Sequence, residues 1–270
     1  PGLGADAVIL DLEDGVATAR KGEARTNMQA FLQGQHDWGM ECFVRLNGVT
    51  TPYFEADLEA SVGVGPHVLV IPKVDSPHIL QRIHARLTER ERALGVSPGS
   101  FALFAQIESA QGIVNAAAIA AATSRLVGVM LGHVDLCVDL GIPAGRVSDG
   151  IVYHARCQLV LAAKAAGVDV VDSIFLNIHD HEGLRAEAAQ AAALGFTGKL
   201  AIHPGQLPVI HEAFTPSAEQ VRRAERILEA WRQAEADGRG VCTLDGELIE
   251  KPVVEAERRV LERARRAERS

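Results

Sequence analysis

Aromatic residues are scarce in this sequence, at 4% of 270 residues, although 47% of the residues are hydrophobic. A core of that size must therefore be built from alanine, valine, leucine and isoleucine. Such side chains suit parallel strands that are buried on both faces and closely covered by helices. The chain is long for one ordinary domain but has a normal length for an α/β barrel.

The sequence also lacks an excess of positive charge and any long apolar run. Its formal net charge is −8, which argues against binding to nucleic acid or to an anionic membrane surface. No run approaches the length of a transmembrane helix. An anionic small-molecule substrate is still compatible with this composition, because it needs only a few local arginines or lysines.

Cysteine is rare and scattered. The four cysteines form no C-x-x-C pair and lie at Cys42, Cys137, Cys157 and Cys242. Isolated cysteines in apolar surroundings are usually buried and reduced. We therefore expect neither a zinc site nor a redox site, and we expect a cytoplasmic protein.

Short apolar runs alternate with amphipathic stretches of ten or more residues. The runs predict strands at Ala7–Leu12, Glu41–Leu46, Val68–Ile71, Phe101–Gln106, Leu126–Leu131, Val168–Asp172 and Lys199–Ile202. The stretches predict helices at Ala19–Leu32, Tyr53–Val62, Pro77–Leu94, Ala110–Ala122, Ile151–Ala166 and Asp180–Leu194. Gly95, Gly167 and Gly195 fall where helices end. Repeated βα units predict a parallel sheet, closed or doubly wound.

Seven predicted strands are one fewer than a (β/α)8 TIM barrel contains. The opening Pro1-Gly2-Leu3-Gly4 resembles the end of a helix that leads into a strand. We therefore expect a first strand and helix to be missing from this chain, and we assign residues 1–214 to a TIM-barrel catalytic domain.

Residues 215–270 follow the last predicted strand. Ser217 and Gln220 have the spacing of a capping box at the start of a charged helix that reaches about Asp237. A hairpin-like segment and a terminal helix rich in arginine and glutamate follow. We expect this C-terminal extension to pack on a neighbouring subunit.

Polar residues follow every predicted strand. They are Asp11, Glu13, Asp14, Arg45, Asn47, Lys73, Gln106, Glu108, His133, Asp135, Asp172 and His203. The carboxyl ends of the strands of a (β/α)8 barrel converge on one mouth. Because both signs of charge are present, the pattern predicts a shared site for an anionic ligand.

Three of these residues suggest specific roles, each with an alternative. Glu108 and Asp135 follow adjacent strands, and two carboxylates plus waters are what Mg²⁺ prefers; alternatively, one of them only caps a helix. Arg45 could bind a substrate carboxylate at two points; alternatively, it forms a structural ion pair with Asp11 or Glu13. The residues alone leave these alternatives open.

Several motifs extend over nearly the whole chain. They are Gly4–Val16, Val44–Gly48, Ile71–Ser76, Ile107–Gly112, Gly195–Lys199, Ile202–Pro204 and Ala213–Ser217. Together, in this order, they resemble the HpcH/HpaI aldolase/citrate lyase family, in its citrate lyase β-subunit-like branch. Family members usually begin with another strand that carries a Phe-Val-Pro-Gly-type motif, which this chain lacks.

The resemblance implies a phosphoenolpyruvate/pyruvate-type TIM barrel and a Mg²⁺-dependent carbon–carbon lyase. Its substrate would be a 3-hydroxyacyl-CoA of the citryl-, malyl- or citramalyl-CoA type, cleaved to an acyl-CoA and a 2-oxo acid. By motif position, Glu108 and Asp135 would hold the metal, and Arg45, Lys73 and Glu108 would contact the substrate. The resemblance also implies a homo-oligomer, a trimer or hexamer, in which Glu250 reaches a neighbour's site as acid or base.

Two departures from the family pattern matter for function. The family commonly reads Gly-x-Glu-Asp-Leu where this chain has Gly132-His133-Val134-Asp135-Leu136. It has Met-Ile-Asp-x-Pro where this chain has Leu248–Pro252, so that Glu250 replaces an aspartate. The departures keep two other functions open: an aldolase of free 2-oxo acids without CoA, and a catalytically weakened paralogue that only binds a carboxylate.

Overall fold

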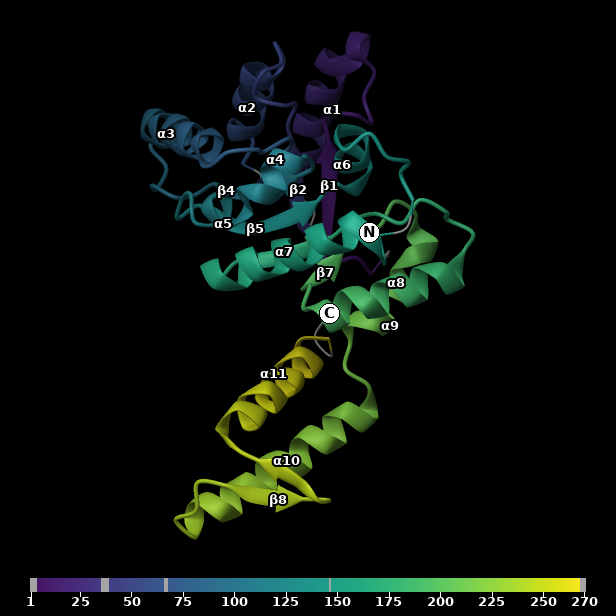
Figure 1. Ribbon diagram of the computed structural model, residues 1–270. Helices are drawn as coiled ribbons and strands as arrows, with labels where there is room; N and C mark the ends of the chain where they lie inside the picture. The colour runs from purple at the N-terminus through teal and green to yellow at the C-terminus, as the bar shows by residue number, and fades with distance from the viewer. Residues whose placement is uncertain (1–3, 35–38, 66–67, 146, 268–270) are drawn as a thin grey trace. The chain divides into compact units, whose positions relative to one another are not determined.

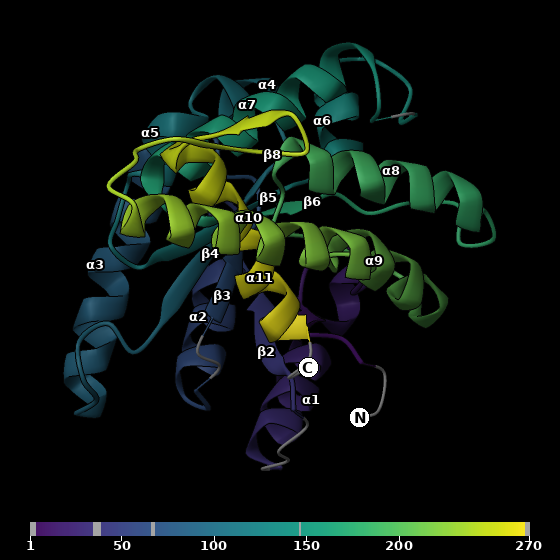
Figure 2. The same ribbon diagram turned by 90° about the horizontal axis from the view of Figure 1, so that it is seen from below.

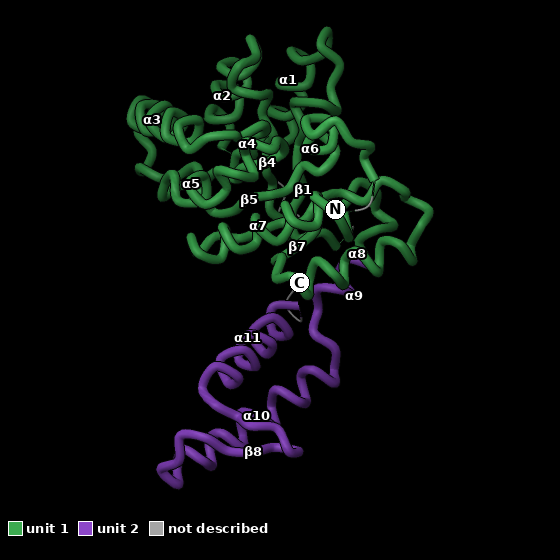
Figure 3. The backbone as a smooth tube through the Cα atoms, viewed as in Figure 1, with its two compact units in different colours: residues 1–207 green, residues 208–270 purple. Residues whose placement is uncertain are grey.

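The computed structural model describes residues 4–34, 39–65, 68–145 and 147–267. Pro1 to Leu3, which belong to the segment expected to be the end of a helix, lie outside the described residues. The chain divides into two compact units, residues 1–207 and 208–270 (Figure 3).

Seven parallel strands form the sheet of the first unit, each hydrogen-bonded to the next in sequence order (Figure 1). They are β1 (Ala7–Asp11), β2 (Glu41–Arg45), β3 (Val68–Ile71), β4 (Ala102–Ile107), β5 (Leu126–Leu131), β6 (Asp169–Asp172) and β7 (Gly198–Lys199). The prediction of consecutive parallel strands in an α/β fold is confirmed. β7 differs most from its prediction, because it has only two residues and ends at Lys199.

Helices follow most of these strands (Figure 2). They are α1 (Lys21–Gln33), α2 (Phe54–Val62), α3 (Pro77–Leu94), α4 (Ala110–Val114), α5 (Ala116–Ala120), α6 (His133–Asp139), α7 (Gly150–Ala166) and α8 (His181–Leu194), with 3₁₀ turns at Thr18–Arg20 and Pro204–Gln206. The helix predicted over 110–122 is instead two short helices that meet at Asn115, and α6 was not predicted. In the described part of the chain, no helix is long and apolar enough to cross a membrane.

Three helices of the first unit end as the sequence predicts. Gly95, Gly167 and Gly195 follow α3, α7 and α8 with φ of 68°, 73° and 101°. This left-handed conformation is open to glycine without the penalty that a Cβ atom brings. It turns the chain sharply out of each helix and toward the strand that follows.

The core of the sheet is largely aliphatic, as the composition predicts. Val70, Phe104 and Met130 form a buried cluster on neighbouring strands, with Phe43 packed against it. The rings of Phe43 and Phe104 lie 5.9 Å apart between centroids. On β5, a methyl group at Gly128 would overlap the ring of Phe104. The Phe104 ring therefore fills the space left by the missing side chain of Gly128 on the neighbouring strand.

The second unit contains α9 (Leu207–Phe214) from its second residue on, α10 (Ala218–Ala236), β8 (Cys242–Leu244), β9 (Glu247–Ile249) and α11 (Lys251–Ala267). The predicted capping box is confirmed: the Gln220 amide donates to Ser217 Oγ at 3.2 Å, and the Ser217 amide donates to Gln220 Oε1 at 2.8 Å. The predicted hairpin turns at Asp245 and Gly246, both with positive φ. Ile227, Trp231, Ile249 and Val254 form the core of this unit.

A buried ion pair joins α3 to the first unit's sheet. Arg125, just before β5, donates from Nη1 and Nη2 to the two carboxylate oxygens of Glu91 at 2.6 Å each. Glu91 also accepts the amides of Gly99 and Phe101. Its side chain is 1% exposed. Hydrogen bonding to Arg125 lowers the pKa of Glu91 to about 2 despite its burial, with the two amides contributing.

We expect Glu91→Gln to destabilise the protein by about 3 kcal/mol, because it leaves the buried Arg125 charge unpaired. The pKa of Glu91 is lower in the folded protein than its ordinary 4.5. Its stabilising contribution is therefore complete above pH 4.5 and is lost as the pH falls toward 2. Melting temperatures of both proteins should converge over that interval. Glu89→Gln, on the exposed side of α3, is the control. An equal loss of stability in both variants would contradict a stabilising role for the Glu91–Arg125 ion pair.

Candidate active site

Lys73 connects the ends of several strands in the first unit. It follows β3 with φ of 55°, an uncommon conformation for a residue other than glycine. Its backbone amide donates to Glu108 Oε1 at 2.8 Å. Its Nζ lies 3.1 Å from Glu13 Oε1 and 3.7 Å from Asp135 Oδ2. Strained backbone of this kind concentrates at functional sites, and here it brings together the predicted residues Lys73, Glu108 and Asp135.

Glu108 is the most buried carboxylate of this group, with 4% of its surface exposed. Besides the Lys73 amide, it accepts a hydrogen bond from Gln106 Nε2. The pKa of Glu108 is raised to about 7, chiefly by burial and also by the charges of Asp135 and Glu13, while the two hydrogen bonds oppose the rise. The site therefore holds a carboxylate that lacks a compensating positive charge.

Arg45, at the end of β2, forms the ion pair that was one of its two predicted alternatives. Its Nε and Nη2 donate to the two oxygens of Asp11 at 2.8 and 2.6 Å. Asp11 is its register partner on β1 and also accepts the amides of Glu13 and Gly15. Although burial opposes it, the Arg45 pair lowers the pKa of Asp11. The remaining guanidinium nitrogen, Nη1, lies 3.5 Å from Glu13 Oε2.

Glu13 has a larger part in this site than the sequence indicated. It is 5% exposed, and one of its oxygens accepts from Lys73 Nζ. Its other oxygen, Oε2, has no hydrogen-bond partner among the described residues. Burial raises the pKa of Glu13, and the neighbouring Asp14 raises it further. The sequence placed Glu13 in an acidic segment after the first strand, but it gave no signal that this carboxylate is buried.

The site carries more negative than positive charge. Its carboxylates are Asp11, Glu13, Asp14, Glu108 and Asp135, and its cations are Arg45 and Lys73. A divalent cation would relieve this excess. Within the described ranges, no group of three or more histidine, cysteine, aspartate or glutamate side chains surrounds one point. Mg²⁺ needs no such group, because it retains several waters beside one or two carboxylates. The carboxylates of Glu108 and Asp135 are thus of the donor type that Mg²⁺ prefers.

Asp172 belongs to a buried ionic network behind the strand ends. Arg156 of α7 donates to both of its oxygens at 3.0 Å, and Lys199 Nζ donates to Oδ2 at 2.8 Å. Lys199 also donates to the Ser173 carbonyl and to Glu187, at 2.7 Å each. Arg156 and Asp172 are fully buried. Asp172 is thus engaged by two cations, and its role here is to hold β6 and β7 in place.

This network extends to the helix that carries Asp135. The Ser173 hydroxyl contacts Nδ1 of His133 and accepts the His133 backbone amide. His133 is 3% exposed and is the first residue of α6. The pKa of His133 is lowered to about 4, chiefly by burial and also by the charge of Lys199. A neutral imidazole therefore anchors the first turn of α6, two residues before Asp135.

Two other predicted residues are His203 and Glu250. His203 is exposed, and its Nδ1 accepts the Gly205 amide at 3.0 Å. Glu250 is exposed in the second unit, between β9 and α11. Its carbonyl accepts the amides of Val253 and Val254 at 3.0 and 3.2 Å. The Glu250 carboxylate is therefore available to solvent at the start of α11.

Consecutive parallel strands with an acidic cluster at their carboxyl ends define an α/β-barrel type of protein with a site suited to a divalent cation. Residues 1–204 match the family model HpcH/HpaI aldolase/citrate lyase. The chain belongs to this family.

Its relatives include carbon–carbon lyase subunits and enzymes of CoA thioesters. Citrate lyase subunit beta of Leuconostoc mesenteroides subsp. cremoris is 34% identical over 97% of this chain and 86% of that protein. A (3S)-malyl-CoA thioesterase of Cereibacter sphaeroides is 37% identical over 97% of this chain and 88% of that protein. The structure of CitE from Mycobacterium tuberculosis in complex with magnesium, acetoacetate and coenzyme A superposes with a TM-score of 0.79 at 37% identity, over 96% of this chain and 90% of that one.

Gly132 packs directly against Glu108, and its lack of a side chain leaves room for that carboxylate. A Cβ at position 132 would lie 2.6 Å from Glu108 Cβ and would overlap its Oε2. We expect Gly132→Ala to displace the Glu108 carboxylate and to weaken Mg²⁺ binding at least tenfold, at a cost in stability of about 1–3 kcal/mol. Calorimetric titration with Mg²⁺ measures the first effect. Gly145→Ala, where the nearest atom is 3.8 Å away, is the control; unchanged Mg²⁺ affinity in both variants would refute the packing role.

Proposed function

We propose that this protein is a Mg²⁺-dependent lyase that cleaves a carbon–carbon bond of a 3-hydroxyacyl-CoA, of the citryl-, malyl- or citramalyl-CoA type. The products are an acyl-CoA and a 2-oxo acid. The observation that carries the proposal is the position of Lys73, which contacts both Glu108 and Asp135 in a cluster with excess negative charge. The relatives support it, because they include a citrate lyase subunit and a structure with magnesium and coenzyme A.

In this proposal Glu108 and Asp135 hold the metal ion. Glu108 is already oriented by Gln106 and by the Lys73 amide, and Asp135 is carried by the anchored first turn of α6. Bound Mg²⁺ would supply a Lewis acid that favours the alkoxide of the substrate and the carbonyl of the product.

Arg45 and Lys73 would bind the carboxylate of the oxo-acid portion. Asp11 takes the Nε and Nη2 donors of Arg45, so the substrate would meet the Nη1 end of the guanidinium. The Lys73 ammonium, which is half exposed, adds a second positive charge. Asp11 would thus position Arg45. A lysine at position 45 could not bind Asp11 and the substrate carboxylate at the same time with the planar arrangement of a guanidinium.

Cleavage is a retro-aldol reaction. The substrate hydroxyl loses its proton to a base, and the bond between the hydroxyl-bearing carbon and the thioester α-carbon breaks. The hydroxyl-bearing carbon becomes the carbonyl of the 2-oxo acid, and the electron pair of the broken bond forms a thioester enolate. This enolate takes up a proton at the α-carbon to give the acyl-CoA. Glu250 of a neighbouring subunit would act as the acid or base in these proton transfers.

We further propose that residues 1–214 carry the barrel and that residues 215–270 pack on a neighbouring subunit, in a homotrimer or a hexamer. Glu250 would reach a catalytic site only by such an arrangement. The four cysteines are free thiols, which is compatible with the reducing cytoplasm that we propose as the compartment.

A second candidate is hydrolysis of the thioester, because a relative at 37% identity is a (3S)-malyl-CoA thioesterase. Two other functions remain as alternatives: an aldolase of free 2-oxo acids, and a paralogue that only binds a carboxylate. The last is favoured by Val134, which removes one acidic side chain next to Asp135. Product analysis distinguishes cleavage from hydrolysis, since cleavage yields acetyl-CoA or a related thioester, whereas hydrolysis yields free CoA.

The lyase assay uses malyl-, citramalyl- and citryl-CoA, each with and without Mg²⁺. We expect cleavage of at least one substrate in the presence of Mg²⁺ and a loss of at least 100-fold with Asp135→Asn, since a metal ligand is removed. The melting temperature should change little, because a residue at the barrel mouth contributes little to the core. Asp139→Asn, on the same helix, is the control. Metal-independent turnover, or full activity of the Asp135 variant, would contradict the role of Asp135 as a ligand of a catalytic Mg²⁺.

The Glu250 role predicts a separate result. Deleting residues 241–270 should reduce turnover far more than Mg²⁺ affinity, but it also removes Ile249 and Val254 from the second unit's core. Glu250→Gln is the sharper variant: we expect kcat to fall about 100-fold or more with unchanged Mg²⁺ affinity. Glu250→Asp should retain activity, and Glu255→Gln is the control. Full activity of Glu250→Gln, or a strictly monomeric protein by light scattering, would contradict the shared site.

A further inference from the structure

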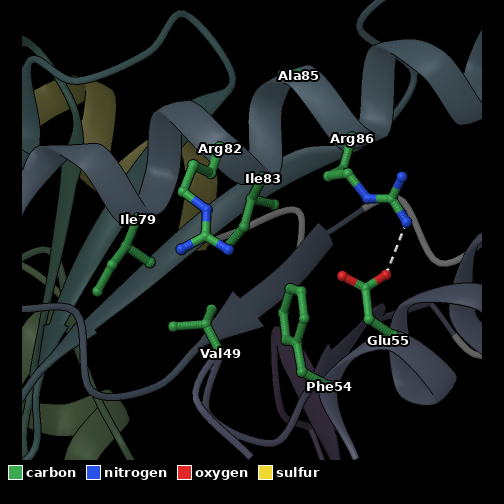
Figure 4. A pocket seen from close by; sticks show the side chains of 8 residues that line it. All are labelled: Val49, Phe54, Glu55, Ile79, Arg82, Ile83, Ala85 and Arg86. Atoms are coloured by element: carbon green, nitrogen blue, oxygen red, sulfur yellow. Dashed lines mark hydrogen bonds and ion pairs between the residues drawn. The ribbon is translucent and has the colours of Figure 1, made fainter.

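A cavity lies between α2 and α3, near the loop that follows β2. Its volume is about 260 Å³. Its apolar lining includes Val49 from the loop, Phe54 from α2, and Ile79 and Ile83 from α3 (Figure 4). Phe54 and Ile83 are buried, and the other two are partly exposed. The cavity is smaller than most sites for drug-sized ligands, so it suits a short hydrocarbon chain.

Two arginines stand at the rim of this cavity, but only one of them is engaged. Arg86 donates to Glu55 at 2.8 Å and lies 3.3 Å from Glu89. No hydrogen bond or ion pair of Arg82 is found in the described ranges, and its guanidinium lies above Val49 in Figure 4. Arg82 thus places an uncompensated positive charge over an apolar floor.

We propose that this cavity binds a small amphipathic monocarboxylate, with its hydrocarbon tail on Val49, Phe54 and Ile83 and its carboxylate on Arg82. A guanidinium offers a planar pair of donors that matches a carboxylate. Glu55 stands at the same rim and neutralises Arg86. The local charge therefore suits a singly charged carboxylate better than a phosphate dianion. This site is independent of the proposed lyase function.

The cavity shares one segment with the catalytic cluster. Val49 lines the cavity, and its neighbour Gly48 faces the Lys73 side chain: a Cβ at Gly48 would lie 3.9 Å from Lys73 Cδ. Asn47 holds the start of this loop, because its side chain donates to the Leu12 carbonyl at 2.8 Å and to Asp57. A ligand in the cavity would therefore touch the loop that carries Gly48 beside the Lys73 side chain.

The test is a calorimetric titration of the full-length protein with hexanoate, in the presence of EDTA so that a metal-bound carboxylate cannot contribute. We expect saturable binding with a dissociation constant in the millimolar range. Arg82→Gln should weaken it about tenfold. Arg92→Gln, an exposed arginine farther along α3, is the matched control and should leave the affinity unchanged. Hexylamine, which has the same tail and the opposite charge, should not bind.

Two further variants test the apolar lining of the cavity and its independence from the catalytic cluster. Ile83→Ala would remove part of the apolar floor and reduce contact with the tail, so hexanoate affinity should fall although Arg82 remains. Asp135→Asn should leave hexanoate binding unchanged, even if the lyase proposal fails. Absence of saturable binding, equal affinity in Arg82→Gln and Arg92→Gln, or loss of binding in Asp135→Asn would each overturn the proposal.

Discussion

An excess of carboxylate charge at the ends of parallel strands is the constraint around which the first unit is organised. Parallel pairing brings the ends of β1, β3, β4 and β5 to one edge of the sheet, and the sequence places acidic residues after three of them. Like charges brought together in this way repel one another and raise each other's pKa. Lys73 and Arg45 compensate only part of the charge, which leaves a site that gains stability from a bound cation.

The features that follow from periodicity and local chemistry could be predicted from the sequence. The buried aliphatic runs are continuous over four to six residues, so they predict parallel strands whatever their neighbours are. Gly95, Gly167 and Gly195 indicate helix ends because few other residues adopt a left-handed conformation without cost. The order of the strands then brings Lys73, Glu108 and Asp135 together, since strands that are adjacent in sequence are adjacent in the sheet.

The features that depend on packing could not be predicted in this way. The sequence left Arg45 with two possible partners, and only the register of β1 against β2 brings its guanidinium to Asp11. Nothing in the segment Asp11–Asp14 distinguishes the buried Glu13 from the exposed Asp14. The predicted helix over 110–122 divides at Asn115, whose side chain donates to the Asp75 carbonyl, a tertiary contact that outweighs the helical propensity of the alanines around it.

The shortest strand, β7, depends more on ionic contacts and less on ladder hydrogen bonds than the other strands of the sheet. β7 pairs with β6 through two residues, and the ionic contacts of Lys199 with Asp172 and Glu187 supplement this short ladder. The free energy needed to remove ions from water falls as temperature rises, because the hydration of charged groups carries a negative entropy. Heating therefore favours these ion pairs relative to their cost at room temperature. The pairing of β6 with β7 should therefore lose less stability on warming than its few ladder hydrogen bonds alone would suggest.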